Sequence, residues 1–78
     1  MILILWLNMN INEKVAERIK LLRKEHKLTA EKLAWYSELS KSCVTYAEKA
    51  QRDIKMSTIE AICKGFNISI AEFFSTFN

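Results

Sequence analysis

The sequence contains no proline and a single glycine, Gly65, among its 78 residues. Tight turns and β-hairpins depend on these two residue types, because glycine tolerates a positive φ and proline fixes φ at a turn position. A chain so poor in both is unsuited to a fold built from many strands and hairpins. The sequence therefore predicts helices joined by short connections.

Five polar residues stand where a helix N-cap is expected, each ahead of apolar residues at helical spacing. They are Asn10, Thr29, Ser40, Ser57 and Ser69. The first and the last two are followed three residues later by a glutamate, which is the pattern of a capping box. We expect helices from Ile11 to about Glu25, from Thr29 to near Ser37, from Lys41 to about Lys49, and after Ser57 and Ser69.

The apolar residues of these helices predict one small shared core. The positions expected to face it are Ile11, Val15, Ile19, Leu22, Leu33, Ala34, Val44, Ala47, Ile59, Ile62, Cys63 and Phe66. Ile68 and Phe73 flank the last cap at the spacing of a hydrophobic staple. Short connections require the helices to cross at steep angles, so we expect one domain over residues 11–78 behind an apolar extension, residues 1–10.

The chain carries 12 basic and 9 acidic residues, a net charge of +3. The excess lies in residues 13–27 and 40–55, both of which are net basic. Such a surface is compatible with the phosphates of DNA, but it is also common in proteins that never bind nucleic acid. Charge alone leaves both interpretations open.

Several other function classes are disfavoured. The two cysteines, Cys43 and Cys63, lack metal-ligand spacing and are too few for a disulfide framework, so a cytoplasmic location is expected. The apolar residues 1–7 have no basic residues ahead of them and are too short to span a membrane. His26 is interpreted as structural, at the end of the first helix. Without a phosphate-binding loop or a nucleophile–base pair, we expect no enzyme, cofactor, metal or small-molecule ligand.

Several blocks of sequence coincide in order and spacing with one known family. They are Arg23-Lys24, Leu28-Thr29 before Glu31-Lys32-Leu33-Ala34, Leu39-Ser40-Lys41-Ser42 with Val44, Glu48, and the closing Ile68-Ser69 to Glu72-Phe73-Phe74. With these residues the chain resembles the Cro and phage-repressor (Xre-type) helix-turn-helix family over residues 17–74. The resemblance implies an all-α, compact five-helix lambda-repressor-like domain that acts as a sequence-specific transcriptional regulator, either a repressor or an operon controller.

The resemblance also implies which residues contact double-stranded DNA. In such motifs the second helix of the pair lies in the major groove, and the preceding helix crosses the backbone. The base-reading positions then fall on Lys41, Ser42 and Tyr46 of the helix over residues 41–49, with Thr45 as a weaker candidate. The positions implied for phosphate contacts are Thr29 and Ala30 at the start of the preceding helix, Cys43, Gln51 and Arg52.

Four residues depart from the family pattern. Ala30 replaces a glutamine that clasps a phosphate and braces the recognition helix, and Glu38 replaces a glycine in a turn that tends to need a positive φ. Ala47 is smaller than the usual aliphatic residue, and Ala50 replaces a frequent glycine. These departures leave an alternative open: a degenerate domain of the same fold that binds a protein, as an antitoxin or an anti-repressor does.

A set of aromatic residues predicts a dimer or partner surface. Its members are Trp6, Trp35, Phe74 and Phe77. Three phenylalanines within residues 73–77 are expected not to fit one narrow stripe, so at least one is expected to meet a partner. The extension is expected to pack on the second helix or across a homodimer, unless Met9 is the true start of the protein. A homodimer would bind a roughly palindromic operator.

Overall fold

The computed structural model describes residues 9–50 and 53–77. The described residues form five α-helices and no strand, as predicted. The helices are α2 (Ile11–Glu25), α3 (Ala30–Ser37), α4 (Lys41–Lys49), α5 (Met56–Phe66) and α6 (Ile70–Phe74). The predicted N-terminal extension lies outside the described residues, apart from its last two positions.

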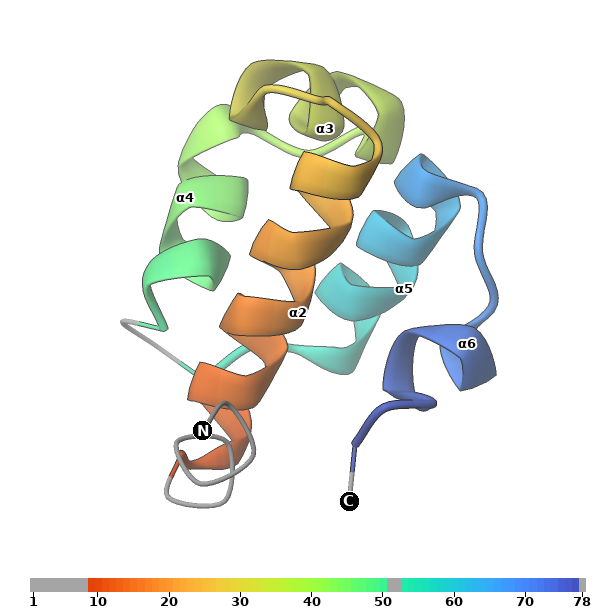
Figure 1. The fold of residues 1–78 in the computed structure, drawn as a ribbon. Coiled ribbons are helices and arrows are strands. Elements are labelled where there is room, and N and C mark those ends of the chain that lie inside the picture. The colour runs from red at the N-terminus through yellow and green to blue at the C-terminus, as the bar shows by residue number, and fades with distance from the viewer. Residues whose placement is uncertain (1–8, 51–52, 78) are drawn as a thin grey trace.

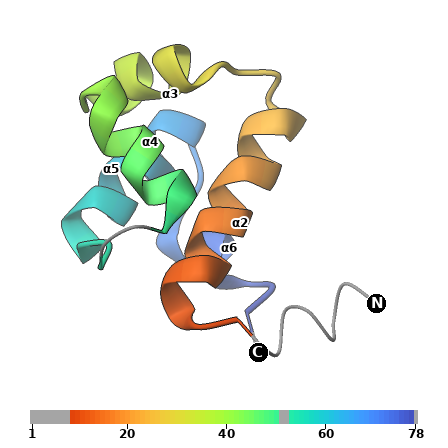
Figure 2. The same cartoon turned by 90° about the vertical axis from the view of Figure 1, so that its left-hand side faces the viewer.

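The helices cross steeply around one centre, so the predicted compact arrangement is confirmed (Figures 1 and 2). Helix α3 lies across the C-terminal end of α2 and packs against both α4 and α5. Helix α4 also packs along α2, and α6 packs on α5. This arrangement leaves the outer side of α4 uncovered by the other described helices (Figure 2).

The core contains almost every position that the sequence predicted for it. Buried residues come from α2, α3, α4 and α5, and the fully buried Phe73 of α6 completes them. Ile11 is the exception, because 59% of its surface is exposed at the start of α2. The prediction that Ile11 faces the core is therefore wrong: as the first residue of α2, it is largely exposed to solvent.

Four of the five predicted N-caps are confirmed. Asn10 forms a complete capping box, in which it accepts from the Glu13 amide at 2.9 Å and donates its own amide to Glu13 Oε1 at 3.0 Å. The side chains of Thr29, Ser40 and Ser69 each accept one amide hydrogen bond from the third residue beyond them. Each of these bonds satisfies an amide that the helix itself leaves without a partner.

The predicted cap at Ser57 is wrong. Helix α5 begins earlier, with Lys55 as its N-cap residue and no side-chain cap bond. A contact from a distant part of the chain accounts for the early start. The Asn12 side chain accepts from the Ile54 amide at 3.3 Å and donates to Asp53 Oδ1 at 2.8 Å, which anchors the segment just before α5.

Three helices end in the same way, and in none of them is the residue with positive φ a glycine. Lys27, Glu38 and Asn67 adopt positive φ values of 55°, 57° and 60°. In each case the next residue donates its amide to a carbonyl five residues back and is partly buried against the core, as in a Schellman motif. The expected positive φ at Glu38 is thus confirmed, and Ala50 after α4 shares it with a φ of 54°.

Replacing Glu38 with glycine is expected to stabilise the fold by about 1 kcal/mol, because glycine adopts a positive φ without the steric penalty of a Cβ atom. Thermal unfolding would show a melting temperature higher by about 4–8 °C. Glu38→Gln is the matched control, since it removes the charge but keeps the Cβ atom. An equal gain from both variants would assign the effect to charge instead of backbone strain.

Gly65 of α5 lies directly against Ser37 of α3. A Cβ atom built on it would lie 2.2 Å from the Ser37 Oγ, 3.2 Å from the Ser37 backbone nitrogen and 3.3 Å from its Cβ. Ser37 is buried, and its Oγ has no hydrogen-bond partner among the described residues. The single glycine of the chain therefore serves helix packing and not a turn.

The three phenylalanines near the C-terminus form one cluster of contacting rings, in which Phe73 is fully buried and Phe74 and Phe77 are half-buried. The ring centroids of Phe73 and Phe74 lie 5.0 Å apart, and those of Phe74 and Phe77 lie 4.8 Å apart. Phe74 and Phe77 are partly buried against the core of their own chain. Arg18 of α2 holds this region in place by donating to the carbonyls of Phe73 at 2.9 Å and Glu72 at 3.1 Å.

The two cysteines lie in different environments. Cys63 is 2% exposed in the core, and burial raises the pKa of its thiol although the positive charge of Arg18 acts in the opposite direction. Cys43 on α4 is half-buried, so its thiol is partly accessible. Alkylation of the native protein by iodoacetamide is expected to modify Cys43 and spare Cys63, because the thiolate is the reacting form. Mass spectrometry of peptides would check this; equal labelling of both would contradict the burial of Cys63.

Candidate nucleic-acid interface

One exposed face of α4 brings together the residues predicted to read bases. Lys41, Ser42, Thr45 and Tyr46 line a single shallow hollow on this face, and Lys49 completes it. Lys41, Ser42 and Tyr46 are exposed, whereas Thr45 is half-buried. The helical spacing of 41, 42, 45, 46 and 49 accounts for the shared face, and the same spacing could have identified Lys49, which the sequence reasoning left out.

The opposite face of α4 fixes the helix to the core. Val44 and Ala47 are buried, with 0% and 3% of their surface exposed. Near the C-terminal end of α4, Glu48 accepts two hydrogen bonds from Arg23 of α2, from Nε at 2.6 Å and from Nη2 at 3.1 Å. Arg23 also donates to the Leu28 carbonyl at 3.1 Å. The sequence marked Arg23 and Glu48 as family residues but did not predict that they pair.

The first turn of α3 lies beside the first turn of α4. Thr29 caps α3 by accepting from the Lys32 amide at 3.1 Å, and Ala30 is partly buried against the core. Ala30 therefore contributes no polar side chain at the position where the family has glutamine. The neighbouring Glu31 instead reaches α4, where its Oε1 lies 3.1 Å from the Lys41 Nζ.

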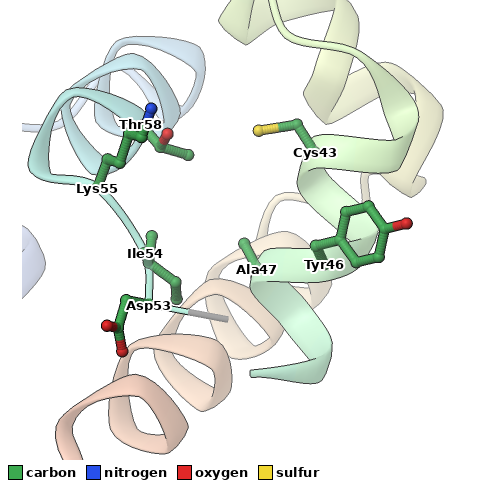
Figure 3. Close-up of a pocket in the computed structure, with 7 residues that line it drawn as sticks. All are labelled: Cys43, Tyr46, Ala47, Asp53, Ile54, Lys55 and Thr58. Atoms are coloured by element: carbon green, nitrogen blue, oxygen red, sulfur yellow. The ribbon is translucent and has the colours of Figure 1, made fainter. Parts of the chain in front are cut away.

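Cys43 lines a second hollow, of about 230 Å³, between α4 and the segment over residues 53–58. Figure 3 shows the thiol directed across this hollow toward Thr58, whereas the Tyr46 ring extends away from Thr58. The small side chain of Ala47 also lines it, next to Ile54. This hollow therefore lies beside the position at which the family has a larger aliphatic residue.

Two of the predicted phosphate-contacting residues, Gln51 and Arg52, lie outside the described residues. The chain that follows them is anchored, because Asp53 and Ile54 both bond to the side chain of Asn12. Asn12 was not predicted as a functional residue. Its role depends on a contact across 41 and 42 positions of sequence, which no local pattern indicates.

Of the predicted partner surface, Trp35 is the most exposed described member, with 81% of its surface accessible. Tyr36 beside it is 53% exposed, and both line a shallow hollow on α3 with Glu31 and Lys32. Trp6 lies outside the described residues. The described chain begins at the end of α2 that is remote from α3 (Figure 1), so the structure leaves Trp35 and Tyr36 uncovered by any described segment.

Other kinds of site were also sought in the part of the chain that the structure describes. No helix there is both long and apolar enough to cross a membrane. The same residues include no group of three or more histidine, cysteine or acidic side chains arranged to hold a metal ion. The ring of His26, the C-cap residue of α2, packs against Phe66 with centroids 5.0 Å apart, in keeping with a structural role.

Two consecutive short helices, of which the second is anchored by one face and exposed by the other, define a helix-turn-helix protein. The family model described as "Helix-turn-helix" matches residues 19–73, which is more than half of the chain. The chain therefore belongs to the helix-turn-helix family. The resemblance to Cro and the phage repressors that the sequence indicated is confirmed.

Individual relatives agree with this assignment. The chain is 37% identical over 57 residues to the immunity repressor protein of Bacillus phage phi105, covering 73% of this chain and 40% of that protein. It thus spans about two fifths of the length of that relative. The wild-type restriction-modification controller protein C.Esp1396I is similar in structure, with a TM-score of 0.80 and 31% identity over 87% of this chain and 88% of that chain.

The same controller protein has also been solved as a tetramer in complex with its natural 35 base-pair operator. Its similarity to the present chain in that complex has a TM-score of 0.81 at 31% identity, over 87% of this chain and 90% of that chain. The likeness covers 87% of this chain, so it is not confined to the helix pair.

Proposed function

We propose that this protein is a sequence-specific DNA-binding transcriptional regulator that reads the major groove with α4. The observation that carries the proposal is the exposed face of α4, where two lysines and three hydroxyl-bearing side chains share one shallow hollow. Lysine ammonium groups and hydroxyls are suited to base edges and phosphates, and α3 is placed to cross the backbone. The family match and the similarity to an immunity repressor and a controller protein support binding as the function, so we infer that the protein acts by binding and not by catalysis.

The binding form proposed is a homodimer on a roughly palindromic site in the cytoplasm. The similarity to an operator-bound tetrameric controller supports an oligomer as the active form. Two-fold symmetry would place two copies of α4 about one helical turn of DNA apart. Trp35, Phe74 and Phe77 remain the predicted dimer or partner surface, together with Trp6.

A salt titration tests DNA binding. The probe is a duplex selected from a random library with the wild-type protein, and its affinity is measured between about 50 and 200 mM salt. If the two α4 faces of a dimer neutralise several phosphates, raising the salt concentration across that range is expected to weaken binding on the order of 100-fold or more. A library that yields no enriched duplex, or an affinity that barely responds to salt, would overturn the proposal.

A second candidate function is a protein-binding module such as an antitoxin or anti-repressor. The observation that favours it is the 81% exposure of Trp35 next to the half-exposed Tyr36. A complex formed through these rings would bury apolar area, so its affinity would respond little to salt. The same titration therefore separates the two functions.

Replacing Lys41 with alanine is expected to lower discrimination at one base pair by about tenfold, because a lysine contact to a base edge contributes roughly 1–3 kcal/mol. The matched variant is Arg52→Ala, which removes one positive charge from a predicted phosphate contact. It should weaken binding to all duplexes alike and lower the salt slope by about one. Binding to single-base variants of the selected duplex measures both; equal losses on every duplex from both variants would contradict these roles.

A further inference from the structure

The exposed face of α4 carries an ion pair to the neighbouring helix of the motif. Lys41 Nζ lies 3.1 Å from Glu31 Oε1, and the pair joins the first turn of α4 to the first turn of α3. Both side chains are well exposed, at 62% and 73%. A carboxylate is thus held beside the lysine predicted to contribute most to base recognition.

The geometry leaves part of the Lys41 ammonium available. An ammonium group has three N–H donors, and Glu31 engages it from the α3 side only. A guanine edge presents two uncharged acceptors, O6 and N7, and can be added to such a pair without displacing the carboxylate. A phosphate in the same place would bring a second negative charge next to Glu31, which is repulsive.

We propose that Glu31 is a specificity-determining residue, which positions the Lys41 ammonium and biases it toward base edges and against phosphates. This inference rests on the proposed function. It assigns to Glu31 the polar link between α3 and α4 that the partly buried Ala30 cannot provide. Specificity here comes from weakening the wrong contact as well as from making the right one.

The test compares two duplexes of equal length: the one selected by the wild-type protein and one of scrambled sequence. Glu31→Gln keeps a hydrogen-bond acceptor but removes the charge. It is expected to raise affinity for the scrambled duplex at least threefold, to change affinity for the selected duplex less than twofold, and to steepen the salt slope on the scrambled duplex by about one. An unchanged ratio of the two affinities would overturn the inference.

Two controls separate positioning from general charge and from folding. Glu60→Gln removes the same charge from an exposed site on α5 and should leave the ratio of affinities unchanged. In a Lys41→Gln background, Glu31→Gln should no longer alter the ratio of the affinities for the selected and the scrambled duplex, because the ammonium that Glu31 positions is absent. A ratio that still falls there would assign the effect to unspecific repulsion and would overturn the positioning role.

Folding and the proposed function are tested by the same samples. Exposed ion pairs contribute little to stability, so the melting temperature of Glu31→Gln should stay within about 3 °C of the wild type. A larger fall would assign Glu31 a structural role and contradict the inference. If the wild type selects a duplex in a salt-dependent way but Glu31→Gln leaves the ratio of affinities unchanged, only the inference about Glu31 is overturned. If the wild type selects no duplex, both this inference and the proposed DNA-binding function are overturned.

Discussion

Replacing Gly65 with alanine is expected to destabilise the protein by about 2 kcal/mol, which lowers the melting temperature by about 8–16 °C. A loss of stability would be informative, because within a helix alanine is normally about 1 kcal/mol more favourable than glycine. Here the added Cβ atom would meet Ser37 of α3 at 2.2 Å from Oγ and 3.2 Å from the backbone nitrogen. The Oγ can rotate away, but the backbone of α3 can yield only if the two helices separate.

The variant Ser37→Ala separates these two contributions. Alone, it removes a buried hydroxyl that has no hydrogen-bond partner among the described residues, so it should be neutral or slightly stabilising. Combined with Gly65→Ala, it should recover about half of the loss, since the contacts with the Ser37 nitrogen and Cβ remain. Thermal unfolding of the four proteins in this cycle measures the coupling. A stabilising Gly65→Ala would show that α3 and α5 do not approach as closely as described.

The helix boundaries could be predicted where a local signal determines them. Asn10, Thr29, Ser40 and Ser69 each satisfy an amide within three residues of themselves, so their sequence position alone indicates the helix start. The core positions followed equally well from helical spacing. Ile11 was misplaced because periodicity identifies a face of a helix but not how far the neighbouring helices extend along it.

Contacts between distant residues could not be predicted in the same way. Helix α5 starts just after a segment that Asn12 of another helix binds, and the capping pattern at Ser57 gives no sign of that contact. The function of Gly65 depends on Ser37, 28 positions away. Sequence reasoning recognised a glycine but could not say which helix approached it.

The candidate site likewise has features that a local sequence signal predicted and a contact between helices that it did not. The shared face of α4 follows from helical spacing and from the family resemblance, and the structure places the predicted base-reading residues together on it. The resemblance marked Ala30 as a lost brace between α3 and α4 but gave no replacement. The structure shows Glu31 of α3 in contact with Lys41, a link that depends on how two helices cross and is not visible in either helix alone.

Replacing Arg23 with alanine is expected to destabilise the fold by about 3 kcal/mol, the largest loss of any variant considered. Arg23 makes a two-point hydrogen bond to Glu48 and a third to the Leu28 carbonyl, so one side chain joins α2, the turn before α3, and α4. The Glu48 side chain is only 11% exposed, and without Arg23 its charge would remain largely buried and unpaired. Urea unfolding at neutral pH measures the loss.

Lys24→Ala is the matched control, because it removes the same charge from the next residue, which is exposed, and should change stability by less than about 0.5 kcal/mol. Glu48→Ala should cost less than Arg23→Ala, since the Arg23 side chain is 25% exposed and its guanidinium can turn toward solvent. The double variant should then lose less than the sum of the two single losses. Additive losses would mean that the pair contributes little, and that α4 is held against α2 by Val44 and Ala47 alone.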